Sequence, residues 1–168
     1  ASLAVVFSHL SLSFFPGLHR FDEPSQSIAW VDWIHHSPFA FWYSGTAAVF
    51  VFFVLSAYVL SFAIYKQQAQ LVDKLQDMMY KRYPRLMIPV LCSCIFTWLV
   101  FNSFQVDSQY TQAWLAEYLA QDVQLGQVLY EGTIGSFFFA ESSVNWVLWT
   151  MQIEFFGSFL LFLLIYLG

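Results

Sequence analysis

Long apolar stretches alternate with shorter polar connections along this chain. Four stretches are candidate membrane segments: Ala1–Phe15, about Phe39–Tyr65, Leu86–Phe104 and Val147–Leu167. A helix needs about 20 mostly apolar residues to cross the hydrocarbon core of a bilayer, and only the first stretch is clearly short for a span. The pattern therefore predicts an all-α fold, a polytopic transmembrane helix bundle with about four spans.

Both ends of the sequence lie within apolar runs. Residue 1 is not methionine, and Ala1–Phe15 lacks the basic flank that precedes the apolar core of a secretory signal. The last residue, Gly168, ends another apolar segment. We therefore expect residues 1–168 to form one partial membrane domain that is truncated at both ends.

The composition excludes an ordinary soluble domain. Apolar residues make up 59% of the chain and charged residues only 10%, against about 45–50% and about 25% in soluble globular proteins. We therefore expect the lipid bilayer as a partner and no nucleic acid.

The charged residues are sorted between the connections. Five of the six Lys and Arg residues lie in Lys66–Arg85, whereas Pro16–Pro38 and Gln105–Asn145 are net negative. Cytoplasmic connections are enriched in Lys and Arg. This distribution predicts a multi-pass protein of the plasma (inner) membrane, with Lys66–Arg85 in the cytoplasm and the other two connections outside.

Two connections carry apolar residues at helical spacing, which predicts amphipathic helices at the membrane surfaces. On the inner side these residues are Leu71, Val72, Leu75, Met78 and Met79, and on the outer side Trp114, Leu115, Tyr118 and Leu119. The segment "GTIGSFFFA" is too short to span a membrane, so we expect it to be re-entrant or buried.

Glu154 is a carboxylate inside an apolar segment. Its neighbours at helical spacing include Thr150, Gly157 and Ser158, which make that face smaller and more polar than the Leu/Phe remainder. Such a face points into a membrane protein rather than at lipid, and ionisable groups within spans are functional candidates. The alternative is a protonated or hydrogen-bonded carboxylate that only joins helices.

His9 is the second candidate. It lies on one helical face with Ser2 and Ser13, so it too is expected to point inward. Histidine is suited to general-base chemistry near neutral pH. A lone histidine in a membrane can also serve only as a hydrogen bond between helices.

Arg82 and Arg85, with Lys81, lie where the predicted cytoplasmic connection enters a span. Guanidinium groups bind phosphates through bidentate hydrogen bonds, so these residues are candidates for anion capture. Basic residues at this place are also expected from topology alone.

No residue pattern indicates a metal site. His19, His35 and His36 accompany Asp32 without a recognised ligand spacing. Cys92 and Cys94 are two residues apart on a helix and point in different directions. We expect no metal.

Four features together resemble acyltransferase family 3, the multi-pass membrane O-acyltransferases. "FFVLSAYVLS" resembles the family's FFxLSG(F/Y) signature, "KRYPR" its RxxR motif and "NWVLWTMQIEFFGS" its WTLxxE segment. His9 matches the histidine of the family's first span. The matching residues of the first and third motifs are Phe52, Phe53, Ser56, Trp149, Thr150 and Glu154. Ala57 replaces the motif glycine, and the family's basic residue eleven positions before the histidine would fall before Ala1.

The resemblance implies a larger domain of about ten spans, each of about 20 residues. It also implies transfer of an acyl group, usually acetyl, from acyl-CoA to a hydroxyl of a carbohydrate or lipid-linked glycan. In that reaction His9 would take the proton from the hydroxyl and Glu154 would orient the imidazole. Arg82, Arg85 and Lys81 would hold the phosphates of acyl-CoA.

Two alternatives remain open. A proton-coupled transporter or channel would use His9 and Glu154 as relay groups, although the spans lack the midplane interruptions typical of transporters. A non-catalytic membrane subunit would transfer no acyl group.

His9 and Glu154 are predicted to face each other across an interior cavity. Counted from Phe15 and Val147, the outer ends of their segments, they lie about 9 Å and about 10 Å deep at 1.5 Å per residue. Two side chains at one depth on inward faces are placed to interact directly or through one water.

The predicted orientation can be tested by cysteine labelling of intact cells. A cysteine placed at Gln68 should be shielded from membrane-impermeant thiol reagents because it would be cytoplasmic, whereas one placed at Gln26 should react. The reverse labelling pattern would invert the topology, and it would remove the argument for a cytoplasmic donor.

Overall fold

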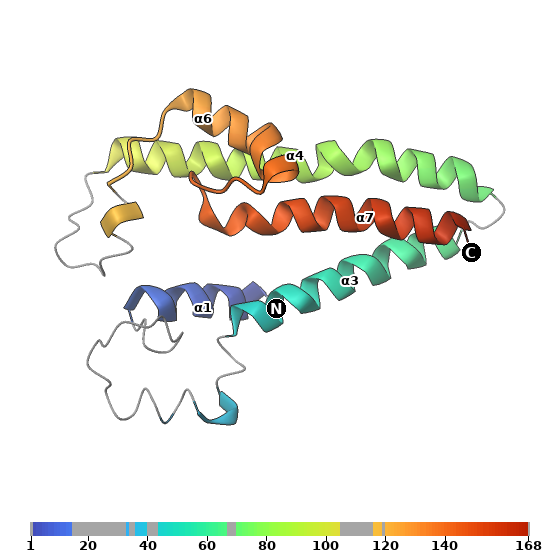
Figure 1. Cartoon of the computed structure of the whole chain (residues 1–168), viewed down its shortest axis with the longest axis horizontal. Coiled ribbons are helices and arrows are strands. Elements are labelled where there is room, and N and C mark those ends of the chain that lie inside the picture. Colours follow the sequence, from blue (N-terminus) through green and yellow to red (C-terminus); the bar gives the residue numbers. More distant parts are fainter. Residues whose placement is uncertain are drawn as a thin grey trace. The chain divides into compact units, whose positions relative to one another are not determined.

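The computed structural model describes residues 2–14, 33, 36–39, 44–66, 70–104, 116–118 and 120–167. The regular elements in these ranges are all helical, as the sequence predicts (Figure 1). They are α1 (Ser2–Phe14), α3 (Gly45–Tyr65), α4 (Leu71–Ser103), α6 (Leu125–Tyr130), the π-helix η5 (Glu131–Phe139), the 3-10 helix η6 (Trp146–Trp149) and α7 (Thr150–Leu167).

Three helices are long and apolar enough to cross a membrane: Gly45–Tyr65, Leu71–Ser103 and Trp146–Leu167. The first predicted segment forms the shorter apolar helix α1, with 13 residues. Large apolar side chains remain exposed along these helices, among them Phe50 and Leu164. Such surfaces suit hydrocarbon rather than water, so the chain is an integral membrane protein.

The chain forms two compact units. The first comprises Ala1–Val54 and Asp107–Gln121, and the second comprises Leu55–Val106 and Asp122–Gly168.

In the first unit, α1 approaches the start of α3 closely at Gly45. A Cβ atom on Gly45 would lie 2.7 Å from Ser8 Oγ, and the Ser8 side chain is buried. Small residues permit such close approach between membrane helices. The outer helix predicted around Trp114 lies mostly beyond the described residues, of which 116–118 are helical.

In the second unit, α4 is one continuous helix of 33 residues, about 50 Å long at 1.5 Å per residue. It includes Pro84 and Pro89. The sequence predicted a surface helix followed by a separate span from Leu86, and this division is wrong. The cytoplasmic assignment of the basic residues stays a prediction.

The first turns of α4 pack against other helices along one face. Leu75 forms a buried cluster with Ile64 of α3 and Phe162 of α7, flanked by Leu71 and Met78. An apolar stripe at helical spacing looks the same in sequence whether a bilayer surface or a neighbouring helix covers it. The position of this stripe at the inner membrane face stays a prediction, and the structure adds that Leu75 packs between helices.

A larger core forms between the second half of α4, α6, η5 and the start of α7. Its buried residues are Val90, Cys94, Val123, Val128, Phe137, Val144, Leu148 and Phe155. Tyr83 of α4 donates a hydrogen bond to the carbonyl oxygen of Thr133 at 2.8 Å. Its ring makes edge contacts with Phe137 and Phe155. One face of the short segment "GTIGSFFFA" is therefore buried against α4, whereas Ile134, Phe138 and Phe139 are exposed. The prediction of a buried segment is confirmed in part.

A glycine allows η5 to lie close to α4. A Cβ atom on Gly132 would lie 2.8 Å from Leu91 Cδ1 and 3.1 Å from Leu91 Cα. The second contact involves backbone, so a larger residue would push the two helices apart.

We therefore expect Gly132→Ala to lower the stability of the full-length protein by about 1–3 kcal/mol through overpacking. Gly126→Ala is the matched control, because a Cβ atom there meets nothing within 4 Å and alanine favours the helix. Thermal unfolding in detergent measures both variants. Equal melting temperatures would contradict the close contact between η5 and α4.

Candidate active site

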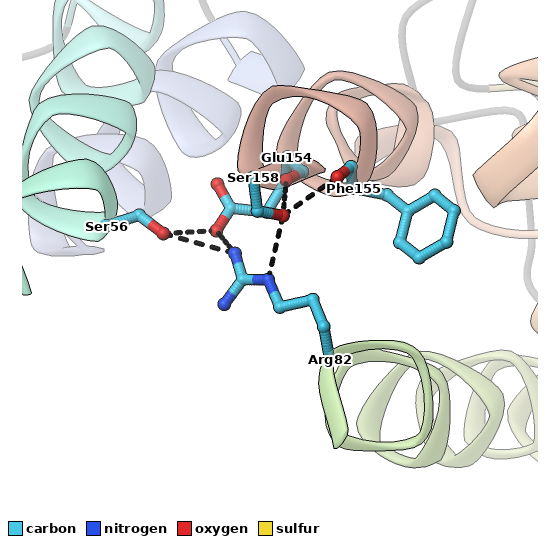
Figure 2. A network of polar contacts seen from close by, with 5 residues as sticks. All are labelled: Ser56, Arg82, Glu154, Phe155 and Ser158. Atoms are coloured by element: carbon cyan, nitrogen blue, oxygen red, sulfur yellow. Dashed lines mark hydrogen bonds and ion pairs between the residues drawn. The ribbon is translucent and has the colours of Figure 1, made fainter. Parts of the chain in front are cut away.

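Helices α3, α4 and α7 meet at a group of polar side chains inside the second unit. The residues are Ser56 of α3, Arg82 of α4, and Glu154 and Ser158 of α7 (Figure 2). The α3–α4 connection joins Tyr65, the end of α3, to Leu71, the start of α4. At 1.5 Å per residue, Ser56 lies about 14 Å from Tyr65 along α3, and Arg82 lies about 17 Å from Leu71 along α4. The two side chains therefore reach the same level from neighbouring helix ends.

The centre of this group is an ion pair between Arg82 Nη2 and Glu154 Oε1. Both side chains are largely buried, with 15% and 16% of their surfaces exposed. Ser56 Oγ donates a hydrogen bond to the same carboxylate oxygen at 2.5 Å and accepts one from Arg82 Nη2 at 3.2 Å. The negative charge of Glu154 is thus compensated by a cation and a hydroxyl from two other helices.

Ser158 holds the other edge of the guanidinium group. Arg82 Nε donates a hydrogen bond to Ser158 Oγ at 3.0 Å. The hydroxyl proton of Ser158 points to helix carbonyl oxygens, with Glu154 O at 2.7 Å and Phe155 O at 2.8 Å. Ser158 is buried. Glu154 and Ser158 therefore point inward, as the sequence predicted, whereas Gly157, assigned to the same face, is exposed.

The arrangement explains a carboxylate in an apolar segment. An isolated charge in a low-dielectric interior is costly, and removal of one partner from a buried pair leaves the other uncompensated. Arg82 supplies the opposite charge at the same level. The sequence placed Arg82 in a connection at the membrane edge, whereas the structure places it within a packed helix because α4 is continuous.

The other basic residues of this segment point away from the pair. Lys81 forms an exposed salt bridge with Asp77 at 2.6 Å. Arg85 is exposed, and within the described residues it has no hydrogen-bond or ion-pair partner. Of the three predicted anion-binding residues, Arg82 is therefore engaged in the buried ion pair, whereas Lys81 and Arg85 are exposed.

A profile for an acyltransferase domain matches residues 1–167 of the chain. The chain belongs to acyltransferase family 3. No curated protein and no solved structure matches it significantly. The family match and the apolar helices together identify a membrane-bound acyltransferase.

The acyltransferase motifs converge on the polar group only in part. Ser56, Arg82 and Glu154 each come from a different motif and touch one another. Phe52 and Phe53 lie on α3 in the first unit, and Phe52 is exposed. Trp149 is an exposed residue at the end of η6. Thr150 begins α7, where its hydroxyl donates a hydrogen bond to Val147 O at 3.4 Å.

His9 is half-buried on α1, and its carbonyl oxygen accepts a hydrogen bond from Ser13 Oγ at 2.8 Å. It belongs to the first unit and Glu154 to the second. Their pairing stays a prediction. Among the described residues, Oε1 of Glu154 takes part in the polar group whereas Oε2 has no hydrogen-bond partner.

Glu131 is 2% exposed and is not among the functional candidates that the sequence indicates. Its carboxylate accepts hydrogen bonds from Val144 N at 2.9 Å, from Gln127 Nε2 at 3.1 Å and from Ser143 Oγ. Glu131 thereby ties the start of η5 to the segment that leads into the "WTMQIE" motif. The sequence gives no signal for this role, because Glu131 is one of several acidic residues in the predicted outer connection and does not lie within a long apolar run.

No group of three or more His, Cys, Asp or Glu side chains suited to a metal ion occurs among the described residues. His19, His35 and Asp32 lie outside that part of the chain. Cys92 is exposed and Cys94 is buried, and neither forms a disulfide.

The ion pair predicts strong energetic coupling in the acyltransferase. Arg82→Met or Glu154→Gln alone should lower stability by about 3–5 kcal/mol, because each leaves a buried partner without its counter-charge. The double variant should lose less than the sum of the two. Denaturant unfolding in mixed micelles gives the coupling from a double-mutant cycle.

The control is the exposed pair on α4, where Lys81→Met and Asp77→Asn should show a coupling of about 0–1 kcal/mol. Additive losses at Arg82 and Glu154, to within about 0.5 kcal/mol, would contradict a buried ion pair.

Proposed function

We propose that the protein transfers an acyl group, acetyl in the first instance, from acyl-CoA to a hydroxyl of a carbohydrate or lipid-linked glycan. The observation that carries the proposal is the polar group in which Ser56, Arg82 and Glu154 meet. Each comes from a separate family motif, and the group lies within an otherwise apolar helix bundle. Ionisable residues retained in such surroundings are functional candidates.

The reaction requires a base, an acceptor hydroxyl and a thioester. The base removes the hydroxyl proton while the acceptor oxygen bonds to the thioester carbonyl carbon. The carbon–sulfur bond then breaks, the acyl group stays on the acceptor, and the proton passes to the coenzyme A thiolate. A positioned base contributes about 10²–10⁴-fold to such a step.

His9 is proposed as this base, with Glu154 as the carboxylate that orients its ring. An imidazolium forms transiently when the base takes the proton, and a nearby carboxylate stabilises it. Glu154 is suited to this role because its Oε1 is held by Arg82 and Ser56. Its Oε2 has no hydrogen-bond partner in the described part of the chain and remains available to an imidazole N–H.

The donor is proposed to be acyl-CoA, held partly through its phosphates by basic residues of "KRYPR". Arg85 and Lys81 have exposed side chains on α4. Arginine presents a planar fork that matches phosphate oxygens. Coenzyme A is a cytoplasmic metabolite, which agrees with the predicted cytoplasmic side of the basic residues.

The test uses the full-length protein in lipid nanodiscs with acetyl-CoA and hydroxyl acceptors, and it measures release of the coenzyme A thiol. His9→Ala should lower kcat by about 10²–10⁴-fold because the base is lost. Glu154→Gln should lower kcat while leaving the KM for the donor unchanged. Glu117→Gln, at an exposed acidic residue, should behave as the wild type.

Transfer at the wild-type rate by His9→Ala would exclude His9 as the base. Proton flux across the membrane without thiol release would indicate a relay protein instead of a transferase.

A further inference from the structure

We propose that the two arginines of "KRYPR" have different tasks: Arg82 positions Glu154, and Arg85 binds the donor phosphate. This assignment rests on the proposed function. It follows from the way in which the hydrogen-bond donors of Arg82 are already used.

The guanidinium group of Arg82 has little capacity left for a ligand. Its Nε donates to Ser158 Oγ at 3.0 Å. Its Nη2 carries two hydrogens and has two partners, Ser56 Oγ at 3.2 Å and the Glu154 carboxylate. Bidentate binding of a phosphate needs two neighbouring donor atoms of the fork. Only Nη1 is without a partner among the described residues, and its neighbour in the fork is Nη2, so such binding would displace Ser56 or Glu154 from Nη2.

The two serines fix the direction of these contacts. Ser158 directs its proton to the carbonyl oxygens of Glu154 and Phe155, which leaves a lone pair for Arg82 Nε. Ser56 directs its proton to Glu154 Oε1, which leaves a lone pair for Nη2. Figure 2 shows the resulting arrangement, in which Arg82 reaches across to α7 between the serine of α3 and that of α7. The carboxylate is therefore held directly from α3 and α4, and Ser158 of α7 orients the arginine that contacts it.

Arg85 has the opposite surroundings. It lies three residues after Arg82 on α4, its side chain is exposed, and it has no described partner. Lys81 lies four residues before it, so the two share one face of the helix. Lys81 is exposed as well, and its ion-pair partner within the described residues is Asp77. This face offers a complete fork and a second positive charge to an anion.

The experiment compares matched lysine variants of the full-length protein, which keep the charge and remove the planar fork. Arg82→Lys should lower kcat on the order of 10- to 100-fold, with the KM for acyl-CoA changed less than about twofold, since a lost transition-state interaction appears in kcat. Arg85→Lys should raise that KM by about tenfold and leave kcat nearly unchanged. Direct binding of coenzyme A should weaken only in Arg85→Lys.

Ser158→Ala keeps the assignment testable if Arg82→Lys does not fold. It should lower kcat by about five- to tenfold without affecting coenzyme A binding, and Ser158→Thr should recover part of the loss because threonine retains the hydroxyl. Ser61→Ala on α3 is the control and should match the wild type.

An increase in donor KM at unchanged kcat in Arg82→Lys or Ser158→Ala would overturn the assignment, as would wild-type kinetics in Ser158→Ala. These outcomes require a wild-type protein that binds coenzyme A and transfers the acyl group. A wild-type protein that does neither overturns the proposed function and the assignment with it.

Discussion

A charged carboxylate among apolar helices is costly without an opposite charge at the same level, and this constraint organises the contact between α3, α4 and α7. Glu154 lies on a helix whose other side chains are mostly Leu and Phe, and Arg82 compensates it from α4. Low dielectric strengthens the attraction within the pair and also penalises either partner alone. The register between α4 and α7 is therefore set by one polar contact, around which apolar packing is arranged.

The packing on the two sides of this contact agrees with that register. Toward one end of α4, Leu75 meets Ile64 and Phe162. Immediately beyond Arg82, Tyr83 packs its ring on Phe137 and Phe155. Leu75 of α4 meets Phe162 of α7, and the later residue Tyr83 meets the earlier residue Phe155. The two helices therefore run antiparallel. Apolar contacts are nearly indifferent to small shifts along a helix axis, whereas an ion pair with directed hydrogen bonds is not.

The same ion pair and its hydrogen bonds also restrict the position of the Glu154 carboxylate, which matters for any chemistry at this site. A base or its orienting carboxylate must be held within a fraction of an ångström of its productive position. Arg82 and Ser56 restrain the Glu154 carboxylate from two other helices, and Ser158 orients Arg82. Glu131 fixes the segment that precedes α7 through Val144. Within "KRYPR", Arg82 contacts the carboxylate whereas Lys81 and Arg85 are exposed, and this difference is the basis of the two tasks proposed for the arginines.

Composition and periodicity by themselves determined the all-α membrane class, the approximate spans and the inward face of α7. They also placed Glu154 and Arg82 among the functional candidates. These inferences succeed because the transfer of apolar side chains into hydrocarbon and the helical repeat are local properties of the chain. Only the tertiary structure decided that α4 is continuous, that Leu75 packs against α3 and α7, and that Arg82 meets Glu154. It also showed that Glu131 is buried. Contacts between residues some 70 positions apart, such as Arg82 and Glu154, depend on which faces of separate helices come together, and an amphipathic pattern in one helix does not specify its partner.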